Sequence, residues 1–294
     1  MDGNKPIGAL IEALPFIRRF RGKTIVVKYG GNAMINGELK AAVIEDVILL
    51  SAVGIRTVLV HGGGPEIEAM LKALGKESRF VRGLRYTDEE TMEVVQMVLC
   101  GKVNKDIAAL IQTAGGKALG LCGIDGALLK ARRLRYTGED GAAEDLGLVG
   151  DIESVDTAIL EAVLAGGAIP VISSVALGIG EAAGRSLNVN ADTAAARIAA
   201  AMGAEKLILM TDVEGILRDV RDNESLIRTI SLAELTALIR EGIINKGMIP
   251  KAECCTLALE GGVKDAHIID GRRPHALLME LFTDEGIGTM IMRS

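Results

Sequence analysis

Short apolar runs and longer periodic stretches alternate along the chain. The short runs predict strands at Thr24–Tyr29, Thr57–His61, Ala168–Ser173, Lys206–Thr211 and Ala266–Asp270. The longer stretches carry apolar residues at helical spacing and predict helices at Glu38–Val53, Glu66–Leu74, Asp88–Gln112, Val155–Leu164 and Ala191–Met202. Strands that alternate with helices are typical of βαβ units, so we expect an α/β fold with a mainly parallel sheet.

Local signals add helix starts and turns to this pattern. A Ser or Thr three residues before Glu predicts a capping box. Such pairs begin two predicted helices: Thr87 with Glu90, and Ser231 with Glu234. The glycine-punctuated stretch from Gly123 to Gly150 predicts hairpins rather than a crossover helix. A second glycine-rich stretch, Leu177 to Leu187, predicts either a hairpin or a hinge between two lobes.

The first twenty residues predict an amphipathic helix ahead of the first strand. Its apolar residues form one stripe at helical spacing: Ile7, Leu10, Ile11, Leu14, Ile17 and Phe20. Pro15 removes a backbone donor and crowds the preceding turn, so we expect a kink there. The helix could be a lid on its own subunit or an interface with another subunit, and the sequence favours neither.

Composition narrows the class of protein. The chain is 49% hydrophobic but only 2% aromatic, which suits a buried parallel sheet covered by helices rich in Ala and Leu. Its net charge of −6 argues against nucleic acid as the main partner. The N-terminal segment lacks the basic-then-apolar order of a signal peptide, and no apolar run approaches the ~18 residues of a membrane span. We therefore expect a cytoplasmic protein whose four cysteines are reduced thiols.

Glycine loops directly follow two of the predicted strands. Lys28 ends an apolar strand and precedes Gly30 and Gly31, so an ammonium group lies beside backbone N–H groups that a phosphate can approach closely. Residues 61–66 repeat the order of strand, glycines and helix, and a helix start attracts anions. Taken singly, these could be an ordinary turn and a flexible loop. We interpret His61 as a structural residue, because no partner that needs a base is evident.

Polar residues gather at strand ends and helix starts in the second half of the chain. Residues 188–192 open a helix, residues 211–215 end a strand, and residues 247–251 open another helix. Asn190 alone is most simply a helix cap, and Asp192 alone is a first-turn acid that complements the helix dipole. Together with the glycine loops, these segments lie where open α/β sheets bind ligands.

These motifs, in this order, resemble the N-acetylglutamate kinases, a branch of the amino acid kinase family. The resemblance runs from about Leu10 to Arg293, and five segments carry it: residues 28–34, 61–65, 83–88, 188–192 and 247–251. It implies a three-layer α/β/α sandwich around a mainly parallel sheet. It also implies an N-terminal lobe, residues 1–177, that binds N-acetyl-L-glutamate and dimerises, and a C-terminal lobe, residues 178–294, that binds ATP and arginine.

The activity that the resemblance implies is ATP-dependent phosphorylation of the side-chain carboxylate of N-acetyl-L-glutamate, a step of arginine biosynthesis. A carboxylate is ionised at neutral pH, so the reaction needs no general base. Lys28 and Lys251 would flank the transferred phosphoryl group, and Asp192 would hold both ammonium groups in place. Mg²⁺ would be held mainly by the phosphates of ATP, so no dedicated protein metal site is expected.

The resemblance also implies binding residues. Arg85 would clamp the α-carboxylate of the substrate with its bidentate guanidinium, and Asn188 would contact the amide and carboxylate. The expected substrate-binding set is Gly63, Gly64, Arg85 and Asn188. The expected nucleotide-binding set is Gly30, Gly31, Asp212, Val213, Glu214, Gly215, Ile216, Leu217, Asn245 and Lys246.

The N-terminal helix and the C-terminal stretch resemble the arginine-sensitive branch of these kinases. In that branch, N-terminal helices of neighbouring dimers interlace into a hexameric ring, a trimer of dimers. The implied arginine site comprises Phe16, His267, Glu280 and Gly286, and His267 and Lys264 are weaker candidates than Glu280. Glu280 suits a guanidinium, and the backbone near Gly286 allows close approach.

Three alternatives stay open. Another kinase of the same fold would act on glutamate, aspartate, carbamate or a nucleotide. A close variant would accept an N-acetylated homologue with one more methylene, which depends on pocket size alone. A protein that keeps the fold but only senses arginine would lack catalytic residues, and the presence of Lys28, Asp192 and Lys251 argues against it.

Overall fold

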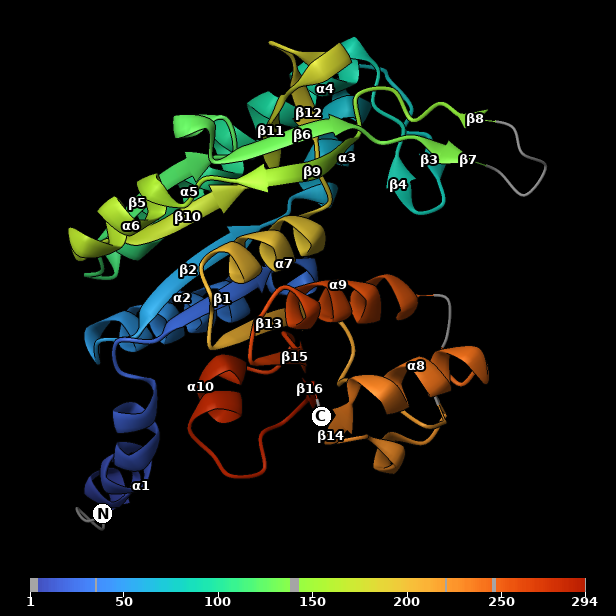
Figure 1. Cartoon of the computed structure of the whole chain (residues 1–294). Coiled ribbons are helices and arrows are strands. Elements are labelled where there is room, and N and C mark those ends of the chain that lie inside the picture. The colour runs from blue at the N-terminus through green and yellow to red at the C-terminus, as the bar shows by residue number, and fades with distance from the viewer. Residues whose placement is uncertain (1–4, 35, 138–142, 220, 245–246, 294) are drawn as a thin grey trace. The chain divides into compact units, whose positions relative to one another are not determined.

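The computed structural model describes residues 5–34, 36–137, 143–219, 221–244 and 247–293, and its contacts divide the chain into two compact units (Figure 1). The first unit joins both ends of the chain, Met1–Val58 and Met202–Ser294, and the second is Leu59–Ala201. The predicted lobes, residues 1–177 and 178–294, have different bounds from these two units. The lobes were defined by the expected ligand binding and dimerisation, and they stay a prediction.

The first unit is an α/β layer structure. Its elements are α1 (Lys5–Phe20), β1 (Thr24–Tyr29), the 3₁₀ turn η1 (Gly31–Met34), α2 (Gly37–Ala52), the start of β2 (Arg56–His61), β13 (Lys206–Thr211), η5 (Asn223–Ser225), β14 (Thr229–Ser231), α8 (Leu232–Arg240), α9 (Ile249–Glu260), β15 (Asp265–Asp270), α10 (Ala276–Leu281) and β16 (Thr289–Met292). The sheet order is β14-β16-β15-β13-β1-β2, in which the pairs β1–β13, β13–β15 and β14–β16 are parallel and β15–β16 is antiparallel. Helix α9 packs against β13 and β15, whereas α10 packs against β15 and α2.

The second unit contains two sheets. Its elements are the end of β2, α3 (Gly64–Ala73), β3 (Phe80–Val81), β4 (Leu84–Arg85), α4 (Glu89–Gln96), the π-helical segment η2 (Met97–Val103), α5 (Asn104–Thr113), β5 (Ala118–Cys122), η3 (Asp125–Ala127), β6 (Leu129–Arg133), β7 (Tyr136–Thr137), β8 (Ala143–Glu144), β9 (Gly150–Val155), α6 (Ala158–Ala165), β10 (Ile169–Ser173), β11 (Val175–Gly178), η4 (Gly180–Ala182), β12 (Ser186–Asn188) and α7 (Ala191–Ala201). Strand β10 pairs in parallel with β2 and β5. A smaller sheet has the order β12-β11-β6-β9. These observations confirm the expected mixed α/β fold with a mainly parallel sheet.

The predicted strands follow from burial on both faces. Strands β1 and β13 have the predicted bounds, and all of their residues except Lys28 are buried. Strands covered on both faces need continuous apolar runs, which is the signal that the sequence shows. The stretch from Gly123 to Gly150 forms antiparallel pairs β6–β9 and β7–β8, and residues 177–187 lie in the β11–β12 hairpin, so both hairpin predictions are confirmed.

Two helix starts differ from the prediction. Helix α4 is capped by Asp88, whose Oδ1 accepts the Thr91 N–H at 2.8 Å, so the capping role assigned to Thr87 is wrong. Thr87 is buried, and its hydroxyl donates to the Arg85 carbonyl oxygen. Val155 belongs to β9, and α6 begins at Ala158, later than predicted. The capping box of Ser231 and Glu234 at the start of α8 is confirmed.

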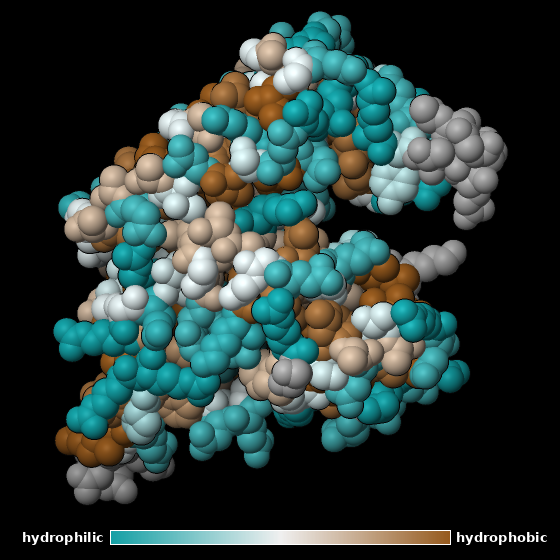
Figure 2. Space-filling view, viewed as in Figure 1, coloured by the Kyte–Doolittle hydropathy of each residue, from teal (hydrophilic) through white to brown (hydrophobic). Residues whose placement is uncertain are grey.

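Helix α1 extends away from the sheet of the first unit (Figure 1) and includes Pro15. Among residues 7–20, whose burial the structure describes, Phe20 at the end of the helix is the buried one, at 1% exposed. The predicted apolar stripe lies mostly in solvent, with Ile7, Leu10 and Ile11 each more than half exposed, and Figure 2 shows hydrophobic surface over this helix. In the described part of the chain, no helix combines the length and apolarity that crossing a membrane requires.

Candidate functional site

A cavity of about 200 Å³ lies in the second unit at the carboxyl ends of its parallel strands. Residues 62–64 follow β2 and form one wall, and Ser174 follows β10. Arg85 of β4 and Asn188 of β12 also line it. The structure therefore brings together all four predicted substrate-binding residues, Gly63 and Gly64 among them, although the contacts to a substrate stay a prediction.

The loop requires glycine at position 63, where it meets the π-helical segment η2. A Cβ atom on Gly63 would lie 2.6 Å from Leu99 Cδ2 of η2, so any side chain would push this wall outward. Pro65 stands in the first turn of α3, and no side chain caps that helix start in the described chain. Backbone N–H groups at an uncapped helix start favour an anion. The loop thus fits a carboxylate or a phosphate oxygen.

His61 holds this loop in place through hydrogen bonds and does not act as a general base. Its Nδ1 atom lies 2.8 Å from the Gly62 carbonyl oxygen, and its Nε2 atom lies 3.1 Å from the Asn104 amide nitrogen. Burial lowers the pKa of His61 to about 4, so the ring is neutral at physiological pH. A neutral ring donates to Gly62 and accepts from Asn104, which agrees with the structural interpretation of this residue.

Arg85 is held by several partners at the mouth of the cavity. Its side chain is 8% exposed, and Nη1 lies 2.8 Å from Glu68 Oε2 and also contacts the Ser78 hydroxyl. Nη2 donates to the Gly64 carbonyl oxygen at 3.3 Å, and the guanidinium lies over the Phe80 ring. Hydrogen bonds from Ser78 and Arg85 hold the pKa of Glu68 below its usual value. The guanidinium is therefore oriented in advance, with Glu68 as its counter-ion.

Asn188 and Asn190 have separate tasks. The Asn188 amide donates to the Thr87 hydroxyl at 3.1 Å, and Thr87 in turn donates to the Arg85 carbonyl oxygen, so one buried threonine links the Asn188 side chain to the backbone at Arg85. Asn190 Oδ1 accepts the Asp192 and Thr193 N–H groups, which makes it the cap of α7 as its position suggested. Asp192 stands in the first turn of that helix.

In the first unit, Lys28 and Asp212 lie against the glycines that follow β1. A Cβ atom on Gly30 would lie 2.6 Å from Lys28 Nζ, and one on Gly31 would lie 2.6 Å from Asp212 Oδ1. Gly31 also has φ +69°, which strains other residues. The sequence therefore keeps bare backbone beside the Lys28 ammonium, the arrangement expected for phosphate binding.

The first unit contains a cavity of about 230 Å³ that is lined by apolar side chains and glycine. Four of the predicted nucleotide-binding residues line it: Val213, Gly215, Ile216 and Leu217. The remaining residues that line this cavity are Ile243, Ile244, Gly247 and Met248. Asp212 and Glu214 stand outside this lining, and Asn245 and Lys246 lie outside the described residues.

The predicted catalytic groups stand at the expected ends of elements. Lys28 is the residue before the last in β1, and Lys251 is in the first turn of α9, both in the first unit. Asp192 belongs to the second unit, so its link to the two lysines stays a prediction. Within the described ranges, no group of three or more His, Cys, Asp or Glu residues could hold a metal ion, and binding of Mg²⁺ through ATP phosphates also stays a prediction.

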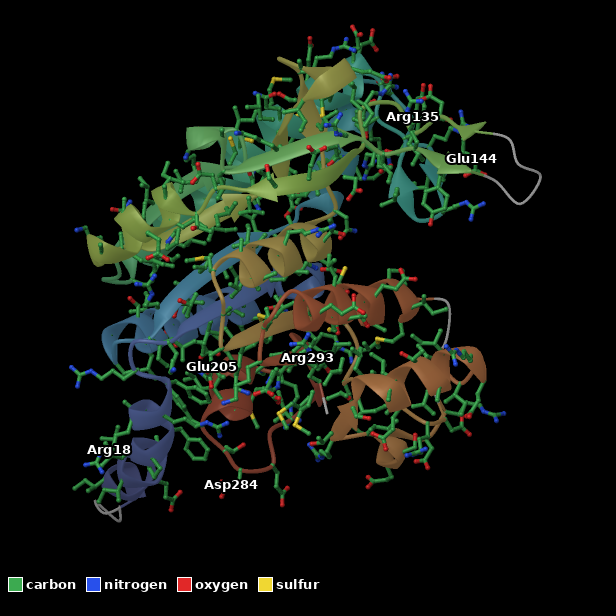
Figure 3. All side chains as sticks on the ribbon, viewed as in Figure 1. Arg18, Arg135, Glu144, Glu205, Asp284 and Arg293 are labelled. Carbon is green, nitrogen blue, oxygen red and sulfur yellow. The ribbon has the colours of Figure 1, made fainter. Side chains whose placement is uncertain are left out.

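A third cavity, about 340 Å³, lies in the first unit and is lined by all four residues of the predicted arginine site: Phe16, His267, Glu280 and Gly286. Lys264 and Asp284 line it as well, and Figure 3 labels Asp284 on the loop between α10 and β16. Gly286 has φ +61°, and a Cβ atom there would lie 2.8 Å from Glu280 Oε2. Glycine at this position therefore lets the loop close over the carboxylate.

Glu280 belongs to a buried network of charged and polar groups. Its Oε2 accepts the Ile287 and Gly288 N–H groups, and its Oε1 lies 2.5 Å from His267 Nδ1. Lys206 donates to His267 Nε2 at 2.7 Å and pairs with Asp265 at 3.2 Å. Burial opposes ionisation of Glu280, but these hydrogen bonds outweigh it and hold its pKa below the usual value. Burial lowers the pKa of His267, which leaves the ring neutral.

Several lining residues escaped the sequence analysis. Lys206 and Asp265 stand at the starts of neighbouring strands in direct register, a pairing that becomes visible only when the two strands are known to be adjacent. Ile243 and Ile244 follow α8 and carry no chemical signature. Leu99 was predicted only as part of a helix, and the π-helical turn that places it against Gly63 leaves no mark in the sequence.

Comparisons with known proteins give the family. A family model described as the amino acid kinase family matches residues 23–270. Acetylglutamate kinase from Heliobacterium modesticaldum is 56% identical over 290 residues, which are 97% of this chain and 97% of that protein. Acetylglutamate kinase from Clostridium kluyveri is 55% identical over 291 residues, which are 99% of this chain and 100% of that protein.

A solved relative extends this result to the fold. N-acetylglutamate synthase from Neisseria gonorrhoeae, complexed with coenzyme A and N-acetyl-glutamate, matches with a TM-score of 0.83 and 31% identity over 98% of this chain and 63% of the synthase. Its complex with coenzyme A and L-arginine matches with a TM-score of 0.78, at 30% identity, over 98% of this chain and 65% of the synthase. This chain thus spans a little under two thirds of that relative. The chain belongs to the amino acid kinase family of phosphotransferases, among the acetylglutamate kinases.

Proposed function

We propose that this chain transfers the γ-phosphoryl group of ATP to the side-chain carboxylate of N-acetyl-L-glutamate and forms N-acetylglutamyl 5-phosphate in cytoplasmic arginine biosynthesis. The observation that carries the proposal is the cavity in which the glycine loop, Arg85 and Asn188 meet. Its N–H groups and guanidinium suit the two carboxylates of the substrate, and the Asn188 side chain suits its amide. Near-full-length relatives with 55–56% identity carry the acetylglutamate kinase name, which supports the same reaction.

In the proposed reaction, an oxygen of the substrate carboxylate attacks the γ-phosphorus of ATP and ADP leaves. No proton has to be removed, because the carboxylate is already ionised. Lys28 and Lys251 stabilise the charge that spreads over the phosphoryl oxygens, and Asp192 orients the two ammonium groups. The glycine backbone at Gly30 and Gly31 receives phosphate oxygens, and the apolar cavity beside Val213 and Met248 receives the base. Mg²⁺ bound to the ATP phosphates offsets their charge.

Chemical trapping tests the proposed product. With ATP, Mg²⁺ and N-acetyl-L-glutamate, an acyl phosphate should form that hydroxylamine converts to the side-chain hydroxamate, identified by mass spectrometry. Release of ADP without any hydroxamate would contradict transfer to a carboxylate.

We further propose that L-arginine inhibits this enzyme by binding in the cavity around Glu280. The cavity combines a carboxylate with carbonyl and aromatic groups, which suit a guanidinium. A related synthase has been crystallised with L-arginine, which supports a site for this ligand on the shared fold. The exposed apolar stripe of α1 supports a hexamer in which this helix packs against its counterpart from a neighbouring dimer.

A conservative substitution separates ligand binding from folding. Glu280→Ala would leave two buried N–H groups without an acceptor, whereas Glu280→Gln keeps an oxygen for Ile287 and Gly288, removes the charge and places an amide nitrogen beside His267 Nδ1. We expect Glu280→Gln to raise the arginine concentration for half-inhibition by about 10- to 100-fold with little change in uninhibited turnover. Glu260→Gln, at the exposed end of α9, is the matched control. Unchanged inhibition in Glu280→Gln would contradict this site.

A further inference from the structure

Two of the four cysteines meet beside the substrate cavity of the second unit. Cys100 lies in the π-helical segment η2, and Cys122 is the last residue of β5. The parallel register places Cys122 directly opposite Ser173 of β10, and Cys100 Sγ lies 3.3 Å from the Ser173 hydroxyl oxygen. The two thiols are close enough to shift each other's pKa. Three segments distant in sequence therefore bring two thiols and one hydroxyl close together.

Solvent reaches this pair but not the other two cysteines. Cys100 and Cys122 are both partly exposed, whereas Cys254 and Cys255 are buried in α9. A small oxidant needs access to a thiolate sulfur, so exposure alone already favours reaction at the Cys100–Cys122 pair.

Neighbouring groups shift the pKa values of the two thiols in opposite directions. Hydrogen bonds from Cys122 and Ser173 lower the pKa of Cys100 to about 7 against the effect of burial, and Lys105 assists while Asp125 opposes. The bond with Cys100 and burial raise the pKa of Cys122. Near neutral pH, Cys100 is therefore available as a thiolate while Cys122 keeps its proton. A peroxide-reducing cysteine and its resolving partner show the same division.

We propose that Cys100 and Cys122 are an oxidation site at which hydrogen peroxide produces an intramolecular disulfide. The Cys100 thiolate attacks one peroxide oxygen, the O–O bond breaks, and the departing hydroxide takes a proton from solvent to give water and a sulfenic acid. Cys122 sulfur then attacks the sulfenic sulfur, its proton leaves with the hydroxyl group as a second water, and the S–S bond forms. The two thiols lose two electrons in total, and the peroxide is reduced to two waters.

The disulfide would restrain one wall of the substrate cavity. Leu99, which precedes Cys100 in η2, lines that cavity and contacts Gly63, and Ser174, the residue after β10, lines it as well. A bond from η2 to the end of β5 would tie the segment that carries Leu99 to the sheet. The effect on kinetics rests on the proposed function. The disulfide should raise the KM for N-acetyl-L-glutamate several-fold and affect the KM for ATP less.

Mass spectrometry tests the bond without any reference to activity. The whole protein is treated with a small molar excess of hydrogen peroxide, blocked with an alkylating reagent and digested without reductant. We expect a single linkage between the Cys100 and Cys122 peptides, and in Cys122→Ser we expect a dimedone-trapped sulfenic acid at Cys100. Ser173→Ala should slow the reaction, while Cys254→Ala should leave it unchanged. No reaction, preferential reaction at Cys254 or Cys255, or linkage between two chains would overturn the proposal.

Kinetics test the coupling to the cavity. Peroxide-treated wild type should show the raised KM for N-acetyl-L-glutamate, dithiothreitol should restore it, and Cys100→Ser should not respond to peroxide. A fully linked enzyme with an unchanged KM would overturn the coupling. Untreated enzyme that fails to turn over N-acetyl-L-glutamate would instead refute the proposed function and leave the mass-spectrometric result standing.

Discussion

The binding role of Arg85 was predicted from the sequence, but the orientation of its guanidinium becomes clear only from the neighbouring residues in the structure. The sequence indicated a carboxylate clamp, and the structure shows a guanidinium already held by Glu68, Ser78 and the Gly64 carbonyl oxygen. These partners fix its orientation before a substrate arrives, which lowers the entropy lost on binding. A substrate carboxylate would meet a preorganised group rather than a flexible side chain.

Removal of this group should weaken substrate binding more than chemistry. We expect Arg85→Ala to raise the KM for N-acetyl-L-glutamate by about 10- to 100-fold, the loss of a charged hydrogen-bonded pair, with a smaller effect on kcat. Arg82→Ala is the matched control, because Arg82 lies on the same β3–β4 hairpin segment but pairs with Glu144 at the surface. Steady-state kinetics with saturating ATP measure both constants. An unchanged KM in Arg85→Ala would contradict the clamp.

Lys28 should act in the opposite way, on kcat. Its ammonium lies against the backbone at Gly30, where charge develops in the proposed transition state. We expect Lys28→Ala, and likewise Lys251→Ala, to lower kcat by about 10²- to 10³-fold with smaller changes in either KM. Lys23→Ala provides the control, since Lys23 precedes the same strand with a side chain 54% exposed. A raised KM for ATP with an unchanged kcat would show that Lys28 contributes only to binding.

Asp46 is a buried carboxyl group that should make stability depend on pH. It is fully buried in α2, its Oδ1 lies 2.7 Å from His275 Nδ1, and the N–H groups of Leu277 and Leu278 at the start of α10 lie nearby. Burial outweighs these contacts and raises the pKa of Asp46 to about 6. Between about pH 4 and pH 6 the folded chain therefore binds a proton that the unfolded chain releases. The stabilisation from this proton is complete below the unfolded pKa and is lost as the pH rises through about 6.

A neutral substitution tests this dependence. Relative to Asp46→Asn, the free energy of unfolding of the wild type should fall by up to ~3 kcal/mol from about pH 4 to about pH 8, as a shift of roughly two pKa units requires. Urea denaturation at several pH values measures it. Asp106→Asn, in an exposed pair with Lys102, should follow the wild type. Parallel pH profiles for wild type and Asp46→Asn would contradict the assignment.

At the scale of elements, the sequence predicted what burial dictates and missed what local geometry decides. Strands β1 and β13 could be predicted to the residue, because burial on both faces demands an unbroken apolar run. The cap of α4 could not, because Thr87 and Asp88 both suit an N-cap and only tertiary burial of Thr87 decides for Asp88. The π-helical segment η2 has no sequence signature, yet it places Leu99 at the cavity and Cys100 beside Ser173.

Helix α1 should control assembly and inhibition together. Its end is anchored by buried Phe20, whereas Leu10 is 69% exposed. A chain that begins at Arg21 would lose this anchor, so Leu10→Asp is the cleaner change. We expect it to convert hexamers into dimers and largely abolish arginine inhibition, because a charge on the stripe opposes helix packing. Glu12→Lys alters charge on α1 away from the stripe and serves as the control. Light scattering and inhibition curves are the measurements, and a hexamer in Leu10→Asp would contradict this interface.

The whole molecule gathers its sites from distant parts of the chain. The first unit is built from both chain ends, so α1 and the stretch from β13 to β16 line one cavity. The cavity proposed for the nucleotide belongs to the same unit, and the cavity proposed for the substrate belongs to the second. Motifs in family order predicted residues that share the cavities around Arg85 and Glu280, but only four of the predicted nucleotide-binding residues line the cavity beside Val213. Register pairs such as Lys206 with Asp265 required the folded chain.

Substrate choice tests the central claim most directly. Initial rates of ADP formation are measured with N-acetyl-L-glutamate, L-glutamate, L-aspartate and carbamate at saturating ATP and Mg²⁺, and kcat/KM is compared. A site built to hydrogen-bond the amide rejects acceptors without it, so N-acetyl-L-glutamate should exceed every other acceptor by at least ~10²-fold. Equal or greater kcat/KM for free L-glutamate, or for carbamate, would contradict the assignment of this chain to N-acetyl-L-glutamate.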